Sequence, residues 1–244
     1  MLFRPLLPSN VHIAEMEPAR ADPSLLVESE RAAIARAVDK RRREYAAGRL
    51  LAHDLLRRAG ADIDMLLNDK DRVPCWPQGV HGCISHCISL CAVAVVSGEG
   101  ASGIGIDVEN AQPMREDLHP MVLRDVERAR VAALPADLAP IGCTIAFSIK
   151  EAVYKAIYPH RRVFLDFHQV ELDFEGEDRF VADVLVPEAT LPGLLRIRGR
   201  FRVADGHIAS AVILPTPAAR TAAHDALRAP SHAGIGSLSP SVTH

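Results

Sequence analysis

The 244-residue chain has no long apolar run and no strong excess of one charge. A transmembrane helix needs about 20 consecutive apolar residues, and the proline-interrupted start, Met1–Pro8, is too short for the apolar region of a signal peptide. We therefore expect a cytoplasmic protein without a membrane partner. A formal net charge of −3 gives no overall field that would gather nucleic acid. Any site for an anion must be local.

Cysteine and aromatic residues are also scarce. The five cysteines are an odd number, and without an export signal we expect free thiols rather than disulfides. Cys83, Cys87 and Cys91 are spaced by four residues and lack a Cys-x-x-Cys pair, so buried thiols are favoured over a zinc site. The single tryptophan, Trp76, lies between two prolines, where it either shapes a pocket or only packs.

Hydrophobic residues make up 48% of the chain, which is enough for a packed core. Residues 28–59 are rich in Ala, Leu, Arg and Glu and are followed by Gly60, which predicts one helix or two in succession. Further helices are expected at 124–134 and 145–157. Apolar runs predict strands at 90–96, 104–108, 170–174, 180–186, 195–203 and 208–214. This order predicts an α+β chain of two comparable halves, 1–106 and 107–215, with 216–244 as a disordered tail.

Two acidic motifs carry the chemistry. The predicted strand at 104–108 leads into Asp107 and Glu109, and the alternation of a strand places both carboxylates on one side. The predicted helix carries Glu151 and Lys155 one turn apart on one face. Three carboxylates suit a hard cation such as Mg²⁺, and the ammonium suits the phosphate that such a metal holds. Taken alone, Glu151 and Lys155 would more often be a surface ion pair.

These motifs carry a family resemblance. Gly103–Glu109 and Phe147–Ala156 resemble the signature of 4′-phosphopantetheinyl transferases. The resemblance is to the long Sfp type and, within that type, to the branch that includes enterobactin synthetase component D. The segments Lys40–Arg49 and Pro74–His86 fit the same branch. Each motif alone is common, but the four together, in the family's order, are specific.

The resemblance implies a fold of two similar α/β halves related by a pseudo-twofold axis, with coenzyme A in the cleft between them. It implies transfer of the 4′-phosphopantetheine arm of coenzyme A to a serine of an apo acyl or peptidyl carrier protein, with release of 3′,5′-ADP. It also implies a monomer, because one chain contains both sides of the site. The long type suggests secondary metabolism, but the sequence does not rank fatty acid, polyketide and non-ribosomal peptide carriers.

The same resemblance assigns roles to the acidic motifs. Asp107, Glu109 and Glu151 would hold Mg²⁺, with Mn²⁺ as an alternative. Glu151 is the first choice for the general base that takes the serine proton, and Glu109 is the second. Lys155 would contact a pyrophosphate oxygen and stabilise the departing ADP.

The other two segments would bind coenzyme A. Arg41 and Arg49 lie eight residues apart, close to one stripe of a helix, and the family's pattern places both on the 3′-phosphate. Ser85 and His86 match the family's Ser/Thr-His step, although a lone histidine is more often structural. The family usually has serine where this chain has Cys83.

One basic position is left undecided by the sequence. Lys70 and Arg72 both precede the Pro74–His86 segment where the family supplies a further cation for coenzyme A, and the spacing does not choose between them.

Two other functions remain open from the residues alone. A metal-dependent phosphohydrolase acting on coenzyme A or a nucleotide would use the same carboxylates and lysine, with water as the nucleophile. A non-catalytic module that binds coenzyme A or a carrier protein would show no turnover and an affinity independent of Mg²⁺.

Overall fold

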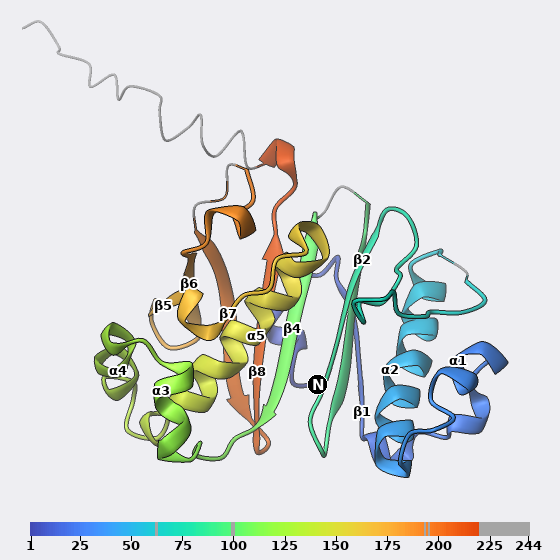
Figure 1. Cartoon of the computed structure of the whole chain (residues 1–244), viewed down its shortest axis with the longest axis horizontal. Coiled ribbons are helices and arrows are strands. Elements are labelled where there is room, and N and C mark those ends of the chain that lie inside the picture. Colours follow the sequence, from blue (N-terminus) through green and yellow to red (C-terminus); the bar gives the residue numbers. More distant parts are fainter. Residues whose placement is uncertain (62, 99–100, 193, 195, 220–244) are drawn as a thin grey trace, which may run out of the picture.

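The computed structural model describes residues 1–219 apart from 62, 99, 100, 193 and 195, and it contains two antiparallel sheets that lie side by side (Figure 1). The first sheet has the order β1-β3-β2, from β1 His12–Met16, β2 Val80–His86 and β3 Cys91–Ser97. The second has the order β4-β8-β7-β6-β5, from β4 Gly103–Asn110, β5 Val170–Phe174, β6 Arg179–Val184, β7 Ile197–Ala204 and β8 His207–Leu214. The predicted disorder of 216–244 falls almost wholly on 220–244, outside the described residues.

Each sheet is covered by one helix of 20 residues, α2 on the first and α5 on the second (Figure 1). The α-helices are α1 Glu28–Ala33, α2 Asp39–Arg58, α3 His119–Val122, α4 Asp125–Ala132 and α5 Gly142–Arg161. Gly60 ends α2 as expected, because its φ of +75° lets two amides turn back onto the last carbonyls: Gly60 donates to Arg57 and Ala61 to Leu56.

The α+β prediction is confirmed, and the stretch 28–59 forms two helices. The halves share a plan of one long helix on an antiparallel sheet but differ in size, with three strands against five. The division at 106/107 stays a prediction; the hydrogen-bonded sheet changes at β4, whose whole length pairs with β8. β1 and β2 were not predicted, because polar residues such as Ser85 and His86 interrupt the apolar pattern of β2.

β4 has two different faces. Ile104, Ile106 and Val108 pack into a core shared with the first sheet. The opposite face begins with glycine and lies against α5: a Cβ built on Gly105 would be 1.9 Å from the carbonyl oxygen of Ala152. Because Gly105 has no side chain, α5 can pack directly against β4 just before the strand reaches Asp107 and Glu109.

We expect Gly105→Ala to damage both the fold and the site. The added methyl would meet helix backbone, which cannot rotate aside, so α5 must shift at a cost of about 1–3 kcal/mol or more. Gly48→Ala is the comparison for stability only: Gly48 lines the cavity, and its added methyl would lie 2.9 Å from a methyl of Ile84, a side chain that can shift where the α5 backbone cannot, so it should cost less than Gly105→Ala. Urea unfolding measures the effect; a Gly105→Ala protein as stable and active as the wild type would contradict this packing.

β2 and β4 meet where the two sheets adjoin, and side chains link them there. Cys83 Sγ lies 3.3 Å from the amide nitrogen of Ile106 and 3.6 Å from its carbonyl oxygen. Ser85 Oγ accepts a hydrogen bond from the amide of Val108 at 3.2 Å. Buried backbone groups of β4 are thus satisfied by side chains of the first half, which fixes the two halves beside each other.

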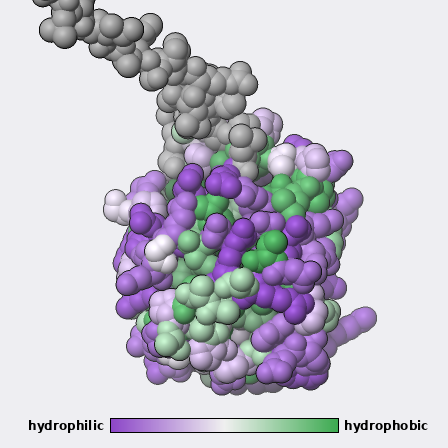
Figure 2. All heavy atoms as spheres, turned by 90° about the vertical axis from the view of Figure 1, so that its left-hand side faces the viewer, coloured by the Kyte–Doolittle hydropathy of each residue, from purple (hydrophilic) through white to green (hydrophobic). Residues whose placement is uncertain are grey.

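All five cysteines are free, as expected; Cys75 is exposed and the other four are buried. The face that carries α3 and α4 is mostly hydrophilic with separate hydrophobic patches (Figure 2). Among the helices the structure describes, none has the length and apolar character needed to cross a bilayer.

Candidate active site

The acidic end of β4 meets α5 through Lys155. The Lys155 ammonium lies 2.6 Å from Asp107 Oδ1 and 3.1 Å from Ser85 Oγ, and Ser85 donates to the same carboxylate oxygen at 2.9 Å. Burial opposes the charge of Lys155, but the charge and hydrogen bond of Asp107, together with the charges of Cys83 and Glu151, outweigh it, and the pKa of the ammonium is raised. The strand, the helix and β2 therefore converge on one carboxylate that is 2% exposed.

Glu109 and Glu151 lie within electrostatic reach of Asp107. Burial raises the pKa of the Glu109 carboxyl to about 7, and the charges of Asp107 and Glu151 add to this while Lys155 offsets part of it. Burial also raises the pKa of Glu151, with Asp107 contributing and Lys155 opposing. Three carboxylates thus repel one another around a single ammonium, which is an arrangement that a further cation would relieve.

The fit of this corner to a divalent cation depends on its donor chemistry. Within the described part of the chain, no three His, Cys, Asp or Glu side chains are already gathered in a metal-binding arrangement. One oxygen of Asp107, Oδ2, is nevertheless buried without a hydrogen-bond partner. A buried carboxylate oxygen with no donor, beside two further carboxylates, fits a hard cation.

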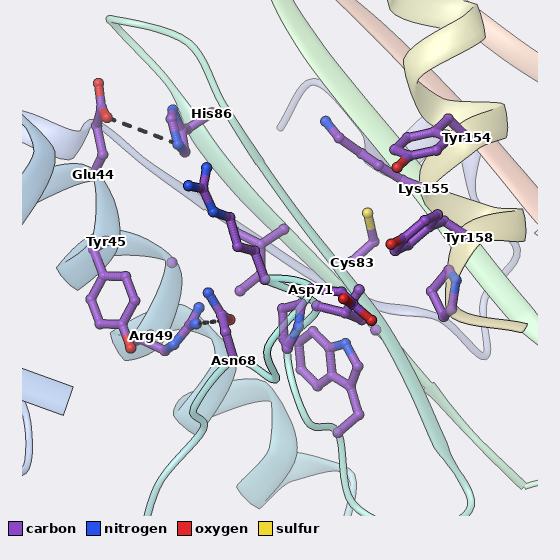
Figure 3. Close-up of a pocket in the computed structure, with 18 of the residues that line it drawn as sticks. Glu44, Tyr45, Arg49, Asn68, Asp71, Cys83, His86, Tyr154, Lys155 and Tyr158 are labelled. Atoms are coloured by element: carbon purple, nitrogen blue, oxygen red, sulfur yellow. Dashed lines mark hydrogen bonds and ion pairs between the residues drawn. The ribbon is translucent and has the colours of Figure 1, made fainter. Parts of the chain in front are cut away.

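A cavity of about 270 Å³ lies beside this corner, between α2 and α5. Figure 3 shows Tyr45 and Arg49 on α2, and Tyr154, Lys155 and Tyr158 on α5, on opposite sides of it. Its polar and charged lining includes Arg41, Glu44, Arg49, Asn68, Asp71, Arg72, His86 and Lys155. The cavity is therefore a mainly cationic pocket with aromatic walls, formed jointly by the two halves.

Arg41 forms one cationic position in the pocket, where His86 and Glu44 hold it. Arg41 Nη1 is 2.9 Å from His86 Nε2, and the Glu44 carboxylate lies 3.4 Å from Arg41 and 3.9 Å from His86. Burial lowers the pKa of the His86 imidazole against the opposing charge of Glu44. Sequence reasoning missed Glu44, whose position three residues after Arg41 on the same helical face is the signal that could have found it.

Arg49 forms the second cationic position. It is 3% exposed, lies over the Tyr45 ring at 4.3 Å, and donates from Nη2 to Asn68 Oδ1 at 2.5 Å. Its Nε is buried without a partner. A buried guanidinium with an unused donor in a pocket wall is suited to an anion.

The remaining predicted residues differ in whether they line the cavity. Arg72 lines the cavity and Lys70 does not. Ser85 lies behind the wall, where it contacts Asp107 and Lys155 rather than the open space. Trp76 lines the cavity and also packs on Gly82, where an added Cβ would be 2.5 Å from its ring, so it serves both the pocket and the packing.

Comparison with known proteins identifies the family. A family model for the 4′-phosphopantetheinyl transferase N-terminal domain matches residues 29–96, and one for the 4′-phosphopantetheinyl transferase superfamily matches residues 103–200. The chain is 36% identical over 199 residues to 4′-phosphopantetheinyl transferase Svp of Streptomyces mobaraensis, covering 80% of this chain and 81% of Svp. The chain belongs to the 4′-phosphopantetheinyl transferase superfamily.

Two further relatives place it within this superfamily. Over 189 residues it is 32% identical to 4′-phosphopantetheinyl transferase PptT of Mycobacterium tuberculosis, covering 74% of this chain and 82% of PptT. Over 121 residues it is 40% identical to enterobactin synthase component D of Salmonella typhi, covering 48% of each. The predicted resemblance to the component D branch is confirmed.

The transferase motif on α5 also contains a lysine that faces away from the cleft. Lys150 is 2% exposed and donates to the carbonyls of Val122 and Phe167 at 2.8 and 2.9 Å and to the Glu127 carboxylate at 2.7 Å. All three of its hydrogens are used. Lys150 therefore holds α5 to the segments that cover it, whereas Lys155 serves the site.

Proposed function

We propose that this 4′-phosphopantetheinyl transferase binds coenzyme A in the cavity between α2 and α5 and passes its phosphopantetheine arm to a serine of an apo carrier protein, releasing 3′,5′-ADP. One observation carries the proposal: Lys155 lines the cationic cavity and at the same time contacts Asp107. Lys155 therefore joins the cationic pocket to the carboxylate corner formed by Asp107, Glu109 and Glu151, so that a bound phosphate and the carboxylates would lie next to each other, as a phosphoryl transfer requires.

The carboxylate corner is assigned to Mg²⁺, with Mn²⁺ as an alternative. Asp107, Glu109 and Glu151 would hold the ion, which would supply charge neutralisation on the pyrophosphate. Glu151 is the first choice for the base that removes the serine proton, and Glu109 is the second; burial raises the pKa of both carboxyls, to about 7 for Glu109, which favours a carboxylate that accepts a proton. Lys155 donates to the leaving phosphate as a fixed point charge.

The cationic pocket is assigned to the phosphates of coenzyme A. Arg41 and Arg49 present guanidinium groups for the 3′-phosphate, and His86, whose Nε2 accepts a hydrogen bond from Arg41, lies beside it in the cavity for contact with a coenzyme A phosphate. Arg72 supplies the additional cation, because it lines the cavity and Lys70 does not. Ser85 contributes indirectly by holding Asp107 and Lys155 in register.

The partner is proposed to be an acyl or peptidyl carrier protein in its apo form, of the polyketide, non-ribosomal peptide or fatty acid type. The reactive serine belongs to that partner. We also propose a monomer, since one chain supplies both walls of the cavity, and a cytoplasmic location, which its five free thiols support.

Coenzyme A affinity tests the pocket. We expect Arg49→Ala and Arg72→Ala each to weaken coenzyme A binding about tenfold or more, because each removes a charge-assisted contact to phosphate. Lys70→Ala is the matched control and should leave affinity unchanged. Isothermal titration, with melting temperatures recorded alongside, makes the comparison; unchanged affinity in folded Arg49→Ala and Arg72→Ala proteins would overturn the assignment of this cavity.

A further inference from the structure

An ion pair crosses between the two halves beside the cavity. Arg162 follows the last residue of α5, and its Nη1 lies 2.6 Å from Asp69 Oδ2 and 3.3 Å from Asp71 Oδ2. Its guanidinium also lies 5.7 Å from the Tyr158 ring centre. Asp71 and Tyr158 both line the cavity (Figure 3), so this bridge forms part of the support of its wall.

The aspartates belong to a tight loop that is organised by one side chain. Asp69 Oδ1 accepts hydrogen bonds from the amides of Asp71 and Val73, both at 2.9 Å, and the Asp69 carbonyl accepts from the amide of Arg72 at 3.0 Å. Asp69 therefore shapes the loop with one carboxylate oxygen while its other oxygen is held by Arg162. The bridge fixes the residue on which the loop depends.

Backbone conformation points to the same place. Among the described residues, three that are not glycine have a positive φ: Arg72 at +66°, Arg162 at +53° and Asp205 at +53°. Asp205 lies in the turn between β7 and β8, whereas Arg162 forms this bridge and Arg72 directly follows Asp71, one of its partners. Positive φ is unfavourable for side chains such as arginine and persists where surrounding contacts enforce it, often at functional sites.

We propose that Arg162 is a positioning residue for coenzyme A, tying the 69–73 loop of the first half to the end of the catalytic helix so that Arg72 faces the cavity. This inference rests on the proposed assignment of the cavity to coenzyme A. Arg162 is not among the residues that line the cavity, and it acts through Asp69. Through this ion pair, the affinity for coenzyme A depends on how the two halves are placed relative to each other.

The test variant is Arg162→Gly, which removes the bridge but suits the left-handed backbone at this position. We expect coenzyme A to bind about fivefold more weakly, the size of one partly exposed charge pair, with a melting temperature equal to or above that of the wild type. KM for coenzyme A should rise with kcat retained. Arg162→Lys should restore part of the affinity, because one carboxylate can still be paired. Raising the salt concentration should narrow the difference between Arg162→Gly and the wild type.

The control is Arg161→Ala, which removes a neighbouring exposed arginine whose Nε donates to the Glu188 carbonyl within the second half. It should bind coenzyme A as the wild type does. Hydrogen exchange gives a readout independent of activity: the amides of Asp71 and Val73 should exchange faster in Arg162→Gly and at the wild-type rate in Arg161→Ala.

The outcomes separate the two claims. If Arg72→Ala weakens coenzyme A binding and Arg162→Gly does not, the positioning role is overturned and the cavity assignment stands. If Arg49→Ala, Arg72→Ala and Arg162→Gly all bind coenzyme A normally, both are overturned. Weaker binding with faster exchange in Arg162→Gly, partly reversed in Arg162→Lys, supports the positioning role.

Discussion

Asp107→Asn abolishes turnover: we expect a fall in rate of at least about a hundredfold, the usual size for loss of a preorganised charge at a reacting centre. The substitution keeps the shape and an oxygen for Ser85 but removes the charge that holds Lys155 and that a divalent cation requires. Transfer to an apo carrier at saturating coenzyme A, followed by chromatography of the carrier, measures the loss.

The matched control for this prediction is Asp183→Asn, since Asp183 pairs with Arg196 in the second half, away from the cavity lining. It should retain the wild-type rate. Melting curves distinguish loss of chemistry from loss of fold. A folded Asp107→Asn protein that transfers at a near-normal rate would remove Asp107 from the site and with it the carboxylate corner.

Lys150→Met should unfold much more readily than the wild type, with the free energy of unfolding reduced by about 3–5 kcal/mol. The reason is burial: Lys150 and Glu127 each have 1% exposed side chains, and removing the ammonium leaves an uncompensated carboxylate. Glu127 also accepts hydrogen bonds from the amides of Arg124 and Leu172, both at 2.7 Å, so its carboxylate cannot move out to solvent. Urea denaturation followed by circular dichroism measures the change.

Lys155→Met provides the contrast: its partner Asp107 is also buried, but the Lys155 side chain is 27% exposed, so water can reach the carboxylate once the ammonium is removed. We expect it to lose turnover while costing less stability than Lys150→Met. Adding Glu127→Gln to Lys150→Met should recover part of the stability, since the buried negative charge is then gone. Equal stability of the two lysine variants would show that Lys150 has no special structural role.

Sequence periodicity was sufficient to predict which site residues lie on the same face of a single strand or helix. Alternation along β4 predicts that Asp107 lies on the face that begins with Gly103 and Gly105, and helical spacing predicts that Glu151 and Lys155 share a face. The structure confirms that strand and helix meet, because Lys155 contacts Asp107. The roles of these residues in metal binding and catalysis remain predictions.

Contacts between distant segments could not be predicted in the same way. Asn68 meets Arg49 within the first half, 19 residues away along the chain, and Arg162 meets Asp69 across the two halves. The choice of Arg72 over Lys70 depends on the backbone of one tight loop, in which Arg72 adopts a positive φ. Sequence spacing carries no signal for any of these, since each depends on tertiary packing.

The measurement that tests the account most directly is intact-mass spectrometry of apo carrier proteins incubated with this protein, coenzyme A and Mg²⁺, with and without EDTA. We predict that a carrier of the acyl, polyketide or peptidyl type gains the mass of one phosphopantetheine arm, that EDTA prevents the gain, and that added Mg²⁺ restores it. No gain on any of these carriers would contradict the account. Release of 3′,5′-ADP in that case would indicate a phosphohydrolase, and no release would indicate a binding module.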